Sequence, residues 1–168
     1  MIEKFKTLFF VKSSLISLYL ALTIPIPFIS TEELKMLSII TFVLGLFLII
    51  NITNDSVNTT NERVSYKTSL ISKIFGKKNW EILWKDIKFI KSLSTSQGSK
   101  VHYFITYKNE SFLVPQRVEN FEKFLHIVEN NTKLNINEIN YISPLWTYKL
   151  LTFLSILMII CEIIAFTI

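Results

Sequence analysis

The chain has 168 residues, half of them hydrophobic, and a formal charge of +5 at neutral pH. A single cysteine excludes a disulfide framework and a metal site built from paired thiols. Only three glycines are present, which disfavours a glycine-rich phosphate loop. Sixteen of the 18 basic residues are lysines interspersed with acidic residues, and this pattern argues against a nucleic-acid-binding protein.

Three apolar stretches enclose one polar block. The stretches cover about Phe9–Phe28, Leu34–Ile52 and Leu150–Ile168. A bilayer core about 30 Å thick requires about 20 apolar residues of helix. The sequence therefore predicts an α+β membrane protein in which three transmembrane helices carry one soluble domain. We expect an N-terminal transmembrane hairpin, a soluble domain and a C-terminal transmembrane helix, at 1–54, 55–141 and 142–168.

The first two stretches are interpreted as a hairpin because little polar sequence separates them. Ser30 and Glu33 have the spacing of a capping box, which predicts the start of the returning helix. A cleavable signal peptide is the alternative for the first stretch, since Lys4 and Lys6 precede an apolar run. Two prolines interrupt the region where a cleavage site would fall, which favours the hairpin.

Basic residues predict the orientation of the chain in the membrane. Lys4, Lys6 and Lys12 precede or begin the first stretch, and thirteen Lys and Arg residues lie in the polar block. The turn of the hairpin has only Lys35. Because basic residues accumulate on the cytoplasmic side, we expect the N-terminus and the soluble domain on the cytoplasmic or stromal face of a plasma or thylakoid membrane. The C-terminus would lie on the opposite side.

Apolar residues within the polar block alternate with a period of two, which predicts strands. After Pro115 the period becomes helical, with Val118, Phe121, Leu125 and Val128 on one face. The sequence thus predicts a small antiparallel β-barrel or sandwich with a C-terminal helix packed over its open end. The expected strands lie at about 64–70, 80–84, 87–93, 101–107 and 111–114.

Two segments and the helix after them carry a family resemblance. TNERVSYK at 60–67 and ILWKDIKFI at 82–90 resemble the bacterial pleckstrin-homology-like (PH-like) domains that are attached to membrane helices. VPQRVENF at 114–121 is similar to a cyanobacterial branch of small membrane proteins with this domain. The resemblance covers about residues 55–131 and implies a PH-like fold without indicating a function. A photosystem I assembly factor of plastids and cyanobacteria has a similar architecture of two N-terminal membrane helices and a soluble domain.

Lysines at one turn are the candidate lipid-binding residues. Lys73, Lys77 and Lys78 flank Gly76, and eukaryotic members of the wider PH fold bind phosphoinositide headgroups with basic residues in such a turn. Lysines near a membrane attract anionic lipid. The sequence therefore predicts weak lipid binding here, and the alternative is an ordinary solvated hairpin turn.

Five residues in or just before the apolar stretches are interpreted from their expected positions in the bilayer. Trp146, Tyr148 and Lys149 precede the third stretch and are expected to anchor it at the headgroup level. Glu162 lies inside this stretch, where a carboxylate is costly and commonly faces a partner. Its expected partner within the chain is Lys35. The alternatives are that Glu162 lies near the far interface or is protonated.

No residue pattern indicates catalysis. His102 and His126 lack metal ligands at suitable spacing and are expected to be exposed, whereas Trp80 and Trp84 are expected in the core. No nucleophile elbow or carboxylate pair is present.

We therefore expect a non-enzymatic, membrane-anchored protein-interaction module without metal or cofactor. It would contact membrane lipid and another integral membrane protein, and would not bind nucleic acid. An assembly or accessory role in a membrane complex follows by architectural analogy, with a photosynthetic complex as the model. An anionic-lipid-sensing module is the alternative, and an unrecognised membrane enzyme is a third possibility.

Overall fold

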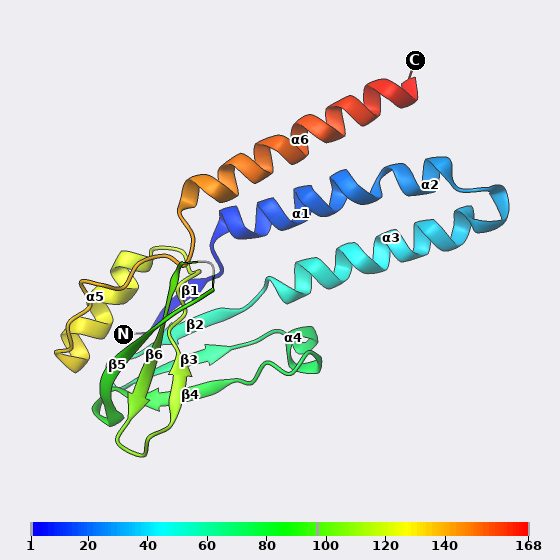
Figure 1. Ribbon diagram of the computed structural model, residues 1–168. Coiled ribbons are helices and arrows are strands. Elements are labelled where there is room, and N and C mark those ends of the chain that lie inside the picture. The colour runs from blue at the N-terminus through cyan, green and yellow to red at the C-terminus, as the bar shows by residue number, and fades with distance from the viewer. Residues whose placement is uncertain (1, 97, 168) are drawn as a thin grey trace. The chain divides into compact units, whose positions relative to one another are not determined.

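The computed structural model describes residues 2–96 and 98–167 and divides into two compact units (Figure 1). The β unit consists of the residues up to Leu8 together with Asn54–Pro144. The helical unit consists of Phe9–Thr53 and the residues from Leu145 onward. The chain therefore leaves the β unit near its start, forms a helical hairpin, and returns.

The β unit is built from two antiparallel sheets and a closing helix. The four-stranded sheet has the order β1 (Glu3–Lys6), β2 (Ser56–Thr59), β3 (Arg63–Lys67), β4 (Trp80–Leu83). The three-stranded sheet has the order β5 (Ile87–Ser94), β6 (Lys100–Thr106), β7 (Ser111–Leu113). A short helix α4 (Leu70–Ile74) joins β3 to β4, and a 3₁₀ turn, Trp84–Asp86, joins the sheets. Over the described residues the strands form two separate sheets, so the barrel alternative is wrong.

Helix α5 (Phe121–Thr132) confirms the predicted closing helix. Phe121, Phe124, Leu125 and Val128 are buried on its inner face. They join one core with side chains from both sheets, including Phe5, Val57, Val64, Ile82, Trp84, Ile87 and Phe104. Trp84 is buried as predicted, and Trp80 is half-buried against the same core.

Strand β1 changes the predicted N-terminal boundary. Glu3–Lys6 pairs antiparallel with β2, and Phe5 enters the core beside Phe124. The predicted hairpin domain at 1–54 therefore begins at Phe9, because the preceding residues belong to the β unit. A four-residue strand with one inward side chain is too short to show an alternating pattern, and its partner strand lies about fifty residues later.

The inward face of β6 is opposite to the expected one. His102, Phe104 and Thr106 are buried, while Val101, Tyr103 and Ile105 are half-buried. The prediction that His102 is exposed is therefore wrong. Both faces of this strand are partly apolar, so alternation alone does not fix which face points inward, and a change of one residue inverts every side chain.

The helical unit has three helices that are long and apolar enough to cross a membrane. They extend over Phe9–Ile29, Glu32–Ile52 and Leu145–Thr167, with mean hydropathies of 1.7, 2.2 and 2.4. The first consists of α1 (Phe9–Thr23) and α2 (Pro25–Ile29), and the others are α3 (Glu32–Ile52) and α6 (Leu145–Thr167). The expected capping box is wrong, because Thr31 is the N-cap of α3. The Ser30 hydroxyl instead donates to the Ile26 carbonyl at 2.6 Å and completes α2.

Small residues allow the helices of this unit to approach closely. Ser14, Ser17 and Ala21 are buried on α1, and Ser155 is buried on α6. Interfaces between membrane helices are enriched in such residues, because short side chains let backbones come together. Phe28 of α2 stacks on Phe166 near the C-terminal end of α6, with ring centroids 5.0 Å apart.

A hydrogen bond between α1 and α3 depends on Gly45. The Tyr19 hydroxyl donates to the Phe42 carbonyl at 2.8 Å, and the tyrosine ring lies over Gly45. A Cβ at Gly45 would overlap the Tyr19 hydroxyl and lie 2.9 Å from its Cζ. The sequence shows Gly45 only as an interruption of an apolar helix.

We expect Gly45→Ala to destabilise the packing of α1 on α3 by about 1–3 kcal/mol, as overpacking does. Tyr19→Phe should cost less, about 0.6 kcal/mol, because it removes one interhelical hydrogen bond. Thermal unfolding of the purified chain in mild detergent measures both changes, with the exposed Leu44→Ala as the control. Alanine favours helix more than glycine does, so a stabilised Gly45→Ala variant would contradict the described contact.

Candidate functional site at helix α4

The segment around α4 ends in local structures that the sequence specifies. The Ser69 side chain caps the helix by accepting a hydrogen bond from the Ser72 amide at 3.1 Å. Gly76 has a φ of 84°, and the amides of Gly76 and Lys77 donate to the carbonyls of Lys73 and Ser72, each at 3.0 Å. This is the Schellman arrangement, in which glycine supplies the left-handed residue after a helix. The segment 69–78 therefore has a defined backbone at both ends.

The α4 segment presents large apolar side chains to solvent. Leu70, Ile74 and Phe75 are 78%, 82% and 69% exposed, while Ser72 is buried on the opposite side of the helix. Lys73 and Lys78 are exposed beside them and form no ion pair within the described chain. An apolar cluster flanked by lysines is typical of a surface that binds the lipid interface.

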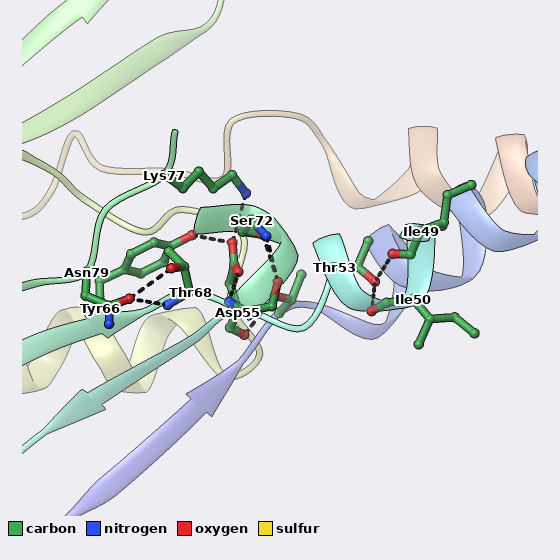
Figure 2. A network of polar contacts seen from close by, with 11 residues as sticks. Ile49, Ile50, Thr53, Asp55, Tyr66, Thr68, Ser72, Lys77 and Asn79 are labelled. Atoms are coloured by element: carbon green, nitrogen blue, oxygen red, sulfur yellow. Dashed lines mark hydrogen bonds and ion pairs between the residues drawn. The ribbon is translucent and has the colours of Figure 1, made fainter. Parts of the chain in front are cut away.

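Asp55 holds the segment 69–78 against β3 through hydrogen bonds, as Figure 2 shows. Its carboxylate accepts hydrogen bonds from the Tyr66 hydroxyl at 2.7 Å, the Lys77 ammonium at 2.9 Å and the Ser69 amide at 3.1 Å. The Asp55 side chain is only 8% exposed. Three donors converging on one buried carboxylate hold β3, the start of α4 and the turn after α4 together.

The donors around Asp55 also determine its charge. Burial alone would raise the pKa of Asp55, but the hydrogen bonds from Lys77, Tyr66 and Ser69 outweigh it and hold the pKa below its usual value. Burial and the neighbouring carboxylate raise the pKa of Tyr66 far above its ordinary range. At neutral pH the site therefore contains an ionised Asp55 and a neutral Tyr66, and Lys77 pairs with the carboxylate.

The three predicted lysines thus have different surroundings. Lys77 is bound to Asp55 and stabilises the segment, whereas Lys73 and Lys78 are exposed at its surface. Asp55 and the apolar residues of α4 were not among the predicted site residues. The signal for the apolar cluster was present, because Leu70 and Ile74 have helical spacing where the strand pattern of β3 stops.

Helix α4 follows the strands of the four-stranded sheet at one particular end. Lys6, Ser56 and Lys67 are neighbours across β1, β2 and β3 at this end. Here the chain continues from Lys6 toward α1, arrives at Ser56 from α3, and continues from Lys67 into α4. The connections to two apolar helices and the α4 segment therefore start from the same end of the sheet.

Glu162 and Lys35 do not form the predicted pair. Lys35 Nζ lies 3.2 Å from Glu32 Oε1, one turn earlier in the same helix. Glu162 lies on the less exposed stripe of α6 with Leu151, Ser155 and Ile159. Its Oε2 is buried and has no hydrogen-bond partner among the described residues. A partner one helical turn away costs less conformational entropy for Lys35 than one on another helix.

The predicted interface anchors lie in the first turns of α6. Trp146 is exposed, as an anchor at the headgroup level would be. Lys149 Nζ lies 4.9 Å from the centroid of the Phe10 ring, a cation–π contact with α1. Tyr148 is half-buried on the stripe of α6 that contains Ser155.

The two histidines have separate environments. His102 is 1% exposed, with Nδ1 2.8 Å from Ser92 Oγ, while His126 lies on the surface of α5. The described residues contain no cluster of three or more His, Cys, Asp or Glu side chains able to hold a metal ion. Burial, with a smaller effect of nearby Lys100, lowers the pKa of His102 below its usual value.

The burial of His102 predicts that the folded chain loses stability in mild acid. The unfolded chain binds a proton on His102 near pH 6.5 and the folded chain does so only at lower pH, so the stability contributed by neutral His102 falls as the pH drops below about 6.5. We expect the unfolding temperature to decrease from pH 7.5 to pH 5.5 by less in His102→Gln than in the wild type. His126→Gln, at an exposed position, is the control. An identical pH dependence in all three chains would contradict the assignment.

Comparison with known proteins gives a relative but does not show a family. The chain is similar to Uncharacterized protein slr0269 of Synechocystis sp. (strain ATCC 27184 / PCC 6803 / Kazusa), with 27% identity over 154 residues, which are 88% of this chain and 77% of the relative. No protein-family model matches. The similarity agrees with the predicted resemblance to an uncharacterised cyanobacterial group.

Proposed function

We propose that the chain is an integral membrane protein whose β unit is a non-enzymatic interaction module for another integral membrane protein. The observation that carries this proposal is the exposure of the apolar helices. None of the 21 residues of α3, all of them described, is buried, and Ser155 is the one buried residue in α6. Exposure of this much apolar surface to water is unfavourable, whereas contact with lipid stabilises it.

The architecture of the β unit supports a PH-like domain as the module. Two antiparallel sheets contribute to one core, and α5 packs against it, as the resemblance implies. The helical hairpin enters this domain between β1 and β2, so the membrane anchor is an insertion into the module. An assembly or accessory role in a membrane complex remains the proposed context, by analogy of architecture.

Topology tests the membrane part of the proposal. The distribution of lysines predicts that reporters placed after Thr31, within 94–99 and after the C-terminus will lie outside, inside and outside the cytoplasmic or stromal compartment. Each location is read from reporter activity in cells. An inside signal at the C-terminus would show that α6 does not cross the membrane.

Purification in mild detergent tests the interaction part. We expect the tagged chain to elute with a second integral membrane protein in fixed ratio, and this complex to persist through a further sizing column. An isolated chain that binds only lipid would instead support an anionic-lipid-sensing module. The exposed apolar and basic surface of α4 is the specific observation that favours this second function.

A further inference from the structure

We propose that α4 and its flanking residues, 69–78, form a wedge that inserts into the lipid interface. Leu70, Ile74 and Phe75 would enter the boundary between headgroups and acyl chains, while Lys73 and Lys78 contact anionic headgroups. This inference rests on the proposed membrane anchoring and goes further, because it gives the β unit a lipid contact of its own.

The apolar cluster is distinctive within the β unit. Among its described large hydrophobic residues, those more than half exposed outside the segment 69–78 are Ile2 and Tyr107, which are far apart in the sequence. Single exposed apolar residues are normal on protein surfaces, whereas a contiguous cluster indicates a contact with a partner or a membrane. Leu70 and Ile74 lie one turn apart on one side of α4, and Phe75 follows directly at its C-cap, so the three exposed side chains lie within six consecutive residues.

The cluster is held rigidly in its exposed position. The Ser69 cap, the Schellman turn at Gly76 and buried Ser72 fix the backbone of the segment. Asp55 adds bonds to the Ser69 amide and to Lys77. These contacts leave the three apolar side chains pointing away from the β unit, so little conformational entropy is lost when they meet a partner.

Charge favours a lipid surface as the partner. The segment 69–78 contains three lysines and no acidic residue. Asp55 neutralises Lys77, which leaves Lys73 and Lys78 as uncompensated positive charges beside the apolar cluster. An apolar face flanked by lysines matches the layered chemistry of an anionic bilayer, where negative headgroups lie above the acyl region.

The chain path also favours lipid. Asp55 follows Ile52, the last residue of α3, by three residues, which span at most about 11 Å. The Ser69 amide is bonded to Asp55 at 3.1 Å. If α3 crosses the membrane, the start of α4 is therefore tethered within a short reach of the bilayer surface.

Site-directed fluorescence in the full chain tests the wedge. Cys161 is the single cysteine, so a Cys161→Ser background accepts one environment-sensitive nitrobenzoxadiazole label at a time. The label is placed by Ile74→Cys in α4, by Tyr107→Cys as the control, and by Phe153→Cys on the exposed surface of α6. Helix α4 precedes β4, and Asp86 follows β4. The Tyr107 amide donates to the Asp86 carbonyl, so Tyr107 lies at the end of β4 that is away from α4.

Each labelled chain is reconstituted in nanodiscs of phosphatidylcholine with 30% phosphatidylglycerol, with or without lipid bearing a doxyl quencher at carbon 5 or carbon 12. We expect the carbon-5 quencher to reduce emission from position 74 at least twofold and to leave position 107 unchanged. Position 153 should be quenched by one or both doxyl lipids. Lys73→Ser with Lys78→Ser should reduce the quenching at position 74, and so should replacement of phosphatidylglycerol by phosphatidylcholine.

The outcomes separate this inference from the proposed function. An unquenched label at position 153 would overturn the membrane anchoring itself. If the label at position 153 is quenched but the labels at positions 74 and 107 are quenched weakly and equally, the wedge alone is overturned. The α4 cluster would then be a surface for a protein. If quenching at position 74 is strong and is unchanged both by Lys73→Ser with Lys78→Ser and by the removal of phosphatidylglycerol, the headgroup contact of Lys73 and Lys78 is overturned.

Discussion

Replacement of Phe124 by alanine is expected to lower the free energy of unfolding of the β unit by about 3–5 kcal/mol. The Phe124 side chain is 0% exposed and meets the Phe5 ring edge-on, with centroids 5.6 Å apart. It also stacks on Phe121 at 6.2 Å. Its removal opens a cavity between α5 and the Phe5 side chain of β1.

Thermal unfolding followed by tryptophan fluorescence, to which Trp80 and Trp84 of the β unit and Trp146 of α6 contribute, measures this effect. For a unit of this size, each kcal/mol corresponds to about 4–8 °C in the unfolding temperature, so a fall of more than about 10 °C is expected. Phe89→Ala is the matched control, because Phe89 is 41% exposed on β5. Equal unfolding temperatures for the two variants would place α5 outside the core.

This experiment requires the full chain. A fragment that begins at residue 55 would contain α5 and strands β2 to β7 but would lack β1. It would therefore lack the Phe5 side chain that packs on Phe124. The sequence predicted such a fragment as the soluble domain, because the apolar stretches separate it so clearly. Pairing between residues fifty positions apart leaves no local signal when one partner has only four residues.

Periodicity predicted the elements that have one clearly apolar face. Helix α5 has apolar residues at helical spacing and charged residues elsewhere, and its inner face is the expected one. Strand β3 likewise buries Val64 between exposed Arg63 and half-buried Ser65. In β6 both faces are mixed, and His102 was predicted on the exposed face although it is buried. The burial of His102 depends on its cross-strand neighbour Ser92, which only the register of β5 and β6 reveals.

Charged residues were harder to place than apolar ones. Glu162 was recognised as unusual from its apolar surroundings, yet its predicted partner Lys35 bonds to Glu32 instead. Asp55 was noted only as the start of the polar block. A carboxylate becomes a hub only when donors from distant segments converge on it, and Tyr66, Ser69 and Lys77 lie 11, 14 and 22 residues away in the chain.

We expect Asp55→Ala to destabilise the β unit by about 2–4 kcal/mol. Hydrogen bonds to a charged group contribute about 1.5–3 kcal/mol, and the substitution leaves the Tyr66 hydroxyl and the Ser69 amide without their acceptor. Lys77 can turn to water, because its side chain is about half exposed. Lys77→Met is therefore the matched control and should cost about 1 kcal/mol or less. Similar losses in the two variants would show that the ion pair alone supports the site.

The charge of Asp55 gives this prediction a dependence on pH. The folded state holds the pKa of Asp55 below its usual value of 3.8, so the unfolded chain takes up this proton first as the pH falls. The stabilisation is present above about pH 3.8 and is lost as the pH drops through the folded value. The unfolding temperatures of the wild type and Asp55→Asn should differ most near neutral pH and converge below about pH 3.8. A constant difference across this range would mean that Asp55 holds α4 by its shape and not by its charge.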